Sequence, residues 1–128
     1  MSNDFRLVPL TEADCLTVLP MIRAFCIEDG VAFEERIPAL LLELLANPHL
    51  GRLFLLKNAR LTLGYAVLSW RFCLEYGGKI AHLDEFYLTP PARGQGVGTA
   101  FIDALAAECV QLGVRKIFLE TVVVNSGA

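Results

Sequence analysis

The sequence lacks the residues that usually hold a metal ion. Only two of its 128 residues are histidines, His49 and His82, and none of its four cysteines lies in a C-x-x-C pair. Structural zinc sites draw on such pairs or on clustered histidines, so no metal is expected. The cysteines, at positions 15, 26, 73 and 109, are expected to be small buried apolar residues in a reducing compartment.

The chain also lacks a long apolar run and an excess of positive charge. No apolar run approaches 18 residues, and the opening MSNDFRLVPL has no apolar signal core, so a cytoplasmic location and no membrane partner are expected. The formal net charge is −3, whereas general nucleic-acid binders are normally basic, so no nucleic-acid partner is expected. Hydrophobic residues make up 55% of the chain, enough for one folded domain over residues 1–128.

The pattern of apolar residues predicts an α/β fold. The expected elements are a strand at 5–10, helices at 11–28 and 33–46, strands within 51–58, 61–76 and 79–89, a helix at 97–112 and a strand at 115–124. This order, β-α-α-β-β-β-α-β, predicts a mixed, mostly antiparallel sheet flanked by helices. The last strand does not alternate, which predicts burial on both faces.

A glycine loop stands between the third long strand and the following helix, in LTPPARGQGVGTAFIDAL at residues 88–105. Free amide groups at a helix start, glycines that permit close approach and the charge of Arg93 together favour an anion, so the loop is a candidate pyrophosphate cradle. It is neither a Walker A loop, because no G-K-[ST] follows, nor a clean dinucleotide G-x-G-x-x-G. The alternative is a plain turn that redirects the chain.

The loop and the strand before it resemble the GCN5-related N-acetyltransferase (GNAT) family. Arg93 to Gly98 match its R-x-x-G-x-G motif, and FYLTP precedes them. The strings PLTEADC and LDEFYL are similar to the diamine and polyamine (spermidine/spermine-type) branch. The resemblance implies transfer of acetyl from acetyl-CoA to a primary amine of a small molecule, a diamine, a polyamine or an amino-acid-like compound. The alternative is a non-catalytic module that binds CoA or a protein.

The resemblance also implies which residues hold acetyl-CoA. The backbone of three strand residues would pair with the pantetheine arm and hold the acetyl carbonyl, and the loop amides would hold the pyrophosphate. An extended amide chain can add to a sheet edge in this way, and an N–H aimed at the carbonyl stabilises an oxyanion. The implied cofactor residues are Phe86, Tyr87, Leu88, Arg93, Gly94, Gln95, Gly96, Val97, Gly98, Thr99 and Asn125.

Two adjacent carboxylates, Asp84 and Glu85, precede the expected acyl site. An ammonium must lose a proton before it attacks a thioester, so either carboxylate is a candidate base, directly or through water. The resemblance favours Asp84, also as a residue that binds the amine. Regular strand geometry places the two on opposite faces, and a bulge would admit both. The alternative is that both are solvated or paired with a lysine such as Lys79.

Other polar and aromatic residues have weaker signals. The resemblance places Glu28 and Asp29 near the amine, while the local sequence favours a solvated helix end before Gly30. His82 is expected to be a partly buried strand histidine. Tyr65 and Trp70 are expected in the core or in a pocket wall.

The end of the sequence departs from the family pattern. After Asn125 and Ala128 the family continues with a helix, further strands and a tyrosine that acts as general acid, so the domain is expected to be C-terminally truncated and to lack that acid. Residues 122–124 would then form an exposed apolar edge, which predicts a homodimer.

Overall fold

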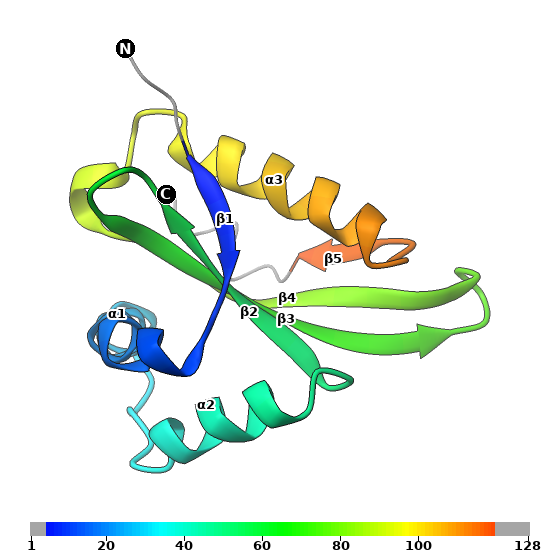
Figure 1. Cartoon of the computed structure of the whole chain (residues 1–128), viewed down its shortest axis with the longest axis horizontal. Helices are drawn as coiled ribbons and strands as arrows, with labels where there is room; N and C mark the ends of the chain where they lie inside the picture. Colours follow the sequence, from blue (N-terminus) through cyan, green and yellow to red (C-terminus); the bar gives the residue numbers. More distant parts are fainter. Residues whose placement is uncertain (1–4, 120–128) are drawn as a thin grey trace.

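The computed structural model describes residues 5–119, which form a five-stranded sheet with helices on both faces (Figure 1). The strands are β1 (Arg6–Pro9), β2 (Gly51–Lys57), β3 (Thr62–Cys73), β4 (Gly78–Leu88) and β5 (Ile117–Leu119), and the helices are α1 (Cys15–Asp29), α2 (Ile37–Ala46) and α3 (Val97–Gln111). The strands lie in sequence order. All neighbours are antiparallel except β4 and β5, which are parallel, so the expected sheet is confirmed.

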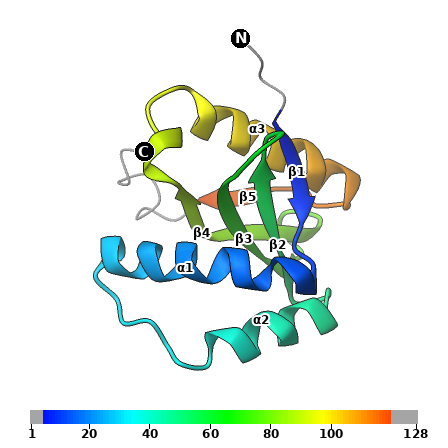
Figure 2. The ribbon, with the colours of Figure 1, turned by 60° about the vertical axis from the view of Figure 1, so that its left-hand side comes forward.

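The sheet separates two hydrophobic cores. Helices α1 and α2 cover one face, and α3 covers the other (Figure 2). On the α3 side the largest fully buried side chains include Phe54, Leu83 and Phe101, and on the α1 side they include Leu55 and Tyr65. Burial on both faces fixes the register of the central strands, and this register positions the polar residues described below.

The helices end where the sequence predicts, but the first two begin later than expected. The first helix was expected from residue 11, whereas a 3-10 helix covers Glu12–Asp14 and α1 begins at Cys15. Gly30 and Gly113, with φ of 72° and 75°, end α1 and α3 in the left-handed conformation that glycine tolerates best. The second helix was expected from residue 33 but begins at Ile37. Pro38 has no N–H for an interior helical bond, so it belongs in the first turn and not further along.

The last described strand differs from its prediction. Burial on both faces was expected, yet Ile117 and Phe118 are only partly buried and Leu119 is 49% exposed. Among residues 5–119, β5 is an edge strand that pairs with β4. The described residues end at Leu119. The rest of the predicted strand, with its apolar residues 122–124, therefore lies outside them, as does Asn125. Within residues 5–119 no helix has the length and apolar character to cross a membrane.

Candidate active site

The glycine loop has the conformation and the free space that an anion cradle needs. Gly94 and Gly96 both have φ of 77°, and a Cβ built on either meets no protein atom within 4 Å. Gly96 is the N-cap of α3, and the first helical hydrogen bond runs from the amide of Ala100 to the carbonyl of Gly96. The amides of the preceding turn therefore have no partner within the helix. These residues fit a phosphate group.

Arg93 at the start of this loop is anchored to the protein. Its Nε donates to the carbonyl oxygen of Leu88 at 2.9 Å, and its Nη2 donates to the two carboxylate oxygens of Glu28 at 2.9 and 2.8 Å. The guanidinium carbon also lies 5.3 Å from the centre of the Tyr87 ring. Thus Arg93, expected to hold the cofactor, and Glu28, expected near the amine, are paired with each other.

A bulge in β4 brings the two adjacent carboxylates to the same side of the sheet. The β3–β4 register pairs Val67 with Glu85 and Leu68 with Leu83, which leaves Asp84 without an opposite residue. Leu83 and Phe86 both pack into the α3-side core, so the two residues between them both lie off that face. Of the two geometries considered from the sequence, the structure has the bulge.

Glu85 is the more enclosed of the two carboxylates. The hydroxyl of Tyr65, itself fully buried, donates to Oε1 of Glu85 at 2.8 Å. Burial raises the pKa of Glu85; the charges of Asp84 and Asp29 add to this, and the Tyr65 hydrogen bond opposes it. Burial and the Glu85 charge raise the pKa of Tyr65, so this hydroxyl stays protonated and remains a donor. The result is a half-buried carboxyl group whose pKa lies above its ordinary value.

The lysine pairing considered for these carboxylates does not occur. The Lys79 ammonium lies 4.7 Å from the centre of the Trp70 ring, and Trp70 is partly buried against the core. His82 is partly buried, stacks on the ring of Phe118 and has its Nε2 3.4 Å from Nη1 of Arg71. It matches the expectation of a strand histidine.

Beside the carboxylates, the second edge of β4 has no partner strand among residues 5–119. Phe86, Tyr87 and Leu88 pair with β3 along one edge, whereas the parallel pairing with β5 covers only Ala81 to Leu83. Within residues 5–119 no strand therefore occupies the other edge of β4 from Asp84 onward. An exposed strand edge of this kind can accept an extended chain of amides.

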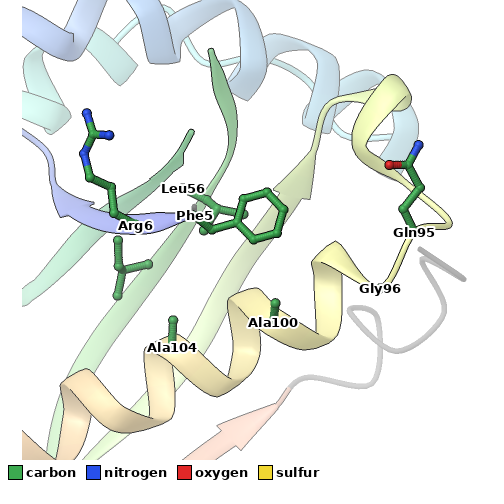
Figure 3. A pocket seen from close by; sticks show the side chains of 8 residues that line it. Phe5, Arg6, Leu56, Gln95, Gly96, Ala100 and Ala104 are labelled. Carbon is green, nitrogen blue, oxygen red and sulfur yellow. The ribbon is translucent and has the colours of Figure 1, made fainter. Parts of the chain in front are cut away.

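A separate groove of about 330 Å³ runs between β1 and the outer side of α3. Its lining residues are Phe5, Arg6, Leu7, Leu56, Gln95, Gly96, Ala100 and Ala104. Figure 3 shows the Phe5 ring reaching toward α3, while the guanidinium of Arg6 points away from the helix. The groove thus meets the glycine loop at Gln95 and Gly96, and the side chains that α3 adds to it are the small ones of Ala100 and Ala104.

The remaining titratable groups show no metal centre and no disulfide. Among the described residues no three His, Cys, Asp or Glu side chains form a group that could hold a metal ion. All four cysteines are free; Cys26 and Cys109 are buried as expected, whereas Cys15 and Cys73 are only partly buried, contrary to the expectation. Burial raises the pKa of Cys109 to about 11, which keeps this thiol protonated.

The glycine loop and the part of β4 beyond Leu83 that no described strand pairs with are the features of this structure that could hold an acyl carrier. The family profile described as "Acetyltransferase (GNAT) family" matches residues 19–128. The chain therefore belongs to the GNAT family and is an acetyl-CoA-dependent N-acetyltransferase. A comparison with curated protein sequences gives no match.

Solved structures share the fold over most of the chain. An integron cassette protein from the mobile metagenome of Cole Harbour Salt Marsh is 31% identical, with a TM-score of 0.82 over 94% of this chain and 80% of the other. A putative acetyltransferase from Arthrobacter sp. FB24 is 28% identical, with a TM-score of 0.78 over 94% and 77%. A predicted acetyltransferase from Clostridium acetobutylicum, crystallised with acetyl-CoA, is 17% identical, with a TM-score of 0.72 over 91% and 80%.

Two parts of the site carried no signal in the sequence. The Tyr65 hydroxyl lies on Glu85 only because the β3–β4 register brings residues 20 positions apart together. The Glu28–Arg93 pair spans 65 positions and depends on how α1 packs beside the end of β4. Periodicity within one element cannot show either contact.

Proposed function

We propose that the chain transfers acetyl from acetyl-CoA to a primary amine of a small cationic molecule, such as a diamine, a polyamine or an amino-acid-like compound. The observation that carries this proposal is the bulge at Asp84, which leaves Asp84 and Glu85 both outside the α3-side core. The influence of Asp29 on the pKa of Glu85 adds a third carboxylate close by. Three carboxylates near the acyl site favour an acceptor with more than one positive charge.

The cofactor would lie along the open edge of β4 and end at the start of α3. The backbone of Phe86, Tyr87 and Leu88 would pair with the pantetheine amides, and the amides from Gly94 to Thr99 would bind the pyrophosphate. Asn125, also expected to contact the cofactor, lies outside the described residues. When bound, acetyl-CoA supplies an acetyl group activated as a thioester.

Glu85 would act as the base for the amine. An alkylammonium has a pKa of about 10, so a base must remove a proton before the nitrogen can attack. The raised pKa of Glu85 improves its match to this task, and the Tyr65 hydroxyl holds its carboxylate in one orientation. Asp84 is exposed and would meet the ammonium from the solvent side.

The test is release of CoA thiol from acetyl-CoA in the presence of a panel of diamines, polyamines and amino acids. The proposal predicts the highest kcat/KM for amines with two or more positive charges. It predicts that Glu85→Gln lowers kcat by about 10²- to 10⁴-fold while CoA still binds in calorimetry. A preference for neutral or acidic acceptors would contradict the cationic substrate, and CoA binding without any turnover would favour a non-catalytic module.

Two further properties remain predictions from the sequence. They are a homodimer and a cytoplasmic location. Light scattering at high protein concentration tests the first of these, and a monomeric mass would contradict it.

A further inference from the structure

The ion pair between Glu28 and Arg93 connects the two halves of the proposed site. Glu28 lies in the last turn of α1, next to Asp29, whose charge acts on Glu85. Arg93 opens the glycine loop before α3. One nitrogen of Arg93, Nη2, donates to both oxygens of Glu28, at 2.9 and 2.8 Å. A group expected to meet a pyrophosphate is therefore occupied by a carboxylate of the protein.

Arg93 has one anchored end and one end that can change partner. The Nε bond to the Leu88 carbonyl, at 2.9 Å, fixes the side chain beside β4 and does not depend on Glu28. The Arg93 and Glu28 side chains are 32% and 48% exposed, and ion pairs of such exposure contribute little stability. A pyrophosphate carries more charge than a carboxylate and suits the planar guanidinium. Exchange of Glu28 for a pyrophosphate therefore costs little.

We propose that Glu28 is a built-in competitor for Arg93, which holds the guanidinium before the cofactor binds and is displaced by the CoA pyrophosphate. This inference rests on the proposed function, because it requires that CoA binds at the glycine loop. Once released, the charge of Glu28 adds to those of Asp29, Asp84 and Glu85. Cofactor binding would then strengthen the attraction for a cationic amine. The opposite possibility is a permanent tether, in which Glu28 holds Arg93 in place for the cofactor.

Calorimetric titration with CoA distinguishes a competitor from a tether, because the two predict opposite changes in CoA affinity for Glu28→Gln. A competitor predicts that Glu28→Gln binds CoA more tightly, by up to about fivefold, the limit set by the strength of an exposed ion pair. A tether predicts weaker binding. Asp29→Asn is the matched control, since it removes the same charge one residue away, and its CoA affinity is expected to change less.

A double-mutant cycle shows whether the effect passes through Arg93. In an Arg93→Gln background, Glu28→Gln is expected to leave CoA affinity unchanged. The inference is overturned if Glu28→Gln binds CoA equally well or more weakly, if Asp29→Asn gives the same gain, or if the gain persists without Arg93. Thermal unfolding by circular dichroism confirms that each variant is folded. If the folded wild-type protein fails to bind CoA, the proposed function itself is rejected, which is a different result.

Discussion

Gly96→Ala separates the structural role of the glycine loop from its proposed role in binding. Gly96 has φ of 77°, so an alanine there costs roughly 1–2 kcal/mol of backbone strain. The added Cβ meets no protein atom within 4 Å, so no steric clash within the protein adds to this cost. For a domain of this size the expected fall in Tm is roughly 3 to 8 °C.

In Gly96→Ala the affinity for CoA should fall by more than the backbone strain at residue 96 explains. The new methyl group would occupy the space in which the pyrophosphate approaches the amides at the start of α3. A lost hydrogen bond to a charged group is worth about 1.5–3 kcal/mol, which corresponds to roughly a tenfold to hundredfold loss of CoA affinity. The assay is calorimetric titration with CoA at a temperature well below both melting points.

Gly113→Ala is the matched control for this experiment. Gly113 has φ of 75°, and a Cβ there also meets nothing within 4 Å, but it lies at the opposite end of α3. The two variants should lose similar stability, and only Gly96→Ala should lose CoA affinity. Equal CoA affinity in the two variants would refute the assignment of the loop as a phosphate cradle.

Three further changes test the base and the core. Tyr65→Phe removes a hydrogen bond that lowers the pKa of Glu85, so the acidic limb of the pH profile of kcat/KM should move to higher pH. If that limb stays at the same pH, Glu85 is not the titrating base. The pKa of Glu85 is higher in the folded protein than in the unfolded chain, where it is about 4.3, so folding favours the protonated form. The contribution of protonated Glu85 to the stability of the fold is complete below the unfolded pKa and is lost as the pH rises through the folded pKa. Glu85→Gln should therefore raise Tm at pH 7 but not at pH 4, and a Tm difference independent of pH would contradict this. Phe101 is fully buried, and its ring centre lies 5.0 Å from that of Phe86. Phe101→Ala should therefore lower the free energy of unfolding, measured with urea, by about 3–5 kcal/mol, and a decrease below about 1 kcal/mol would show that the site is not packed as described.

The sequence predicts those parts of the fold that depend on local chemistry. Glycines that adopt positive φ end α1 and α3 where expected, and the buried stripe of Val97, Phe101 and Leu105 follows the helical period. The glycine spacing predicts the loop because Gly94 and Gly96 adopt positive φ, which glycine tolerates best. The start of α2 was misplaced because apolar periodicity outweighed the constraint from Pro38.

The site itself depends on contacts between distant segments. Alternation along β4 leaves the side of Asp84 and Glu85 undecided, because a single extra residue in the β3–β4 register reverses the pattern. The Tyr65–Glu85 and Glu28–Arg93 contacts likewise require the packed sheet and α1. The sequence therefore locates the candidate cofactor loop, and the tertiary structure is needed to find the contacts of the proposed base.

Mapping of backbone amide shifts on titration with CoA tests the central claim most directly. The account predicts that the largest ¹H–¹⁵N changes fall on Phe86, Tyr87 and Leu88 and on the amides from Gly94 to Thr99, on both sides of the turn that joins β4 to α3. Changes confined to the groove between β1 and α3, around Phe5 and Ala104, or no changes at saturating CoA, would contradict it.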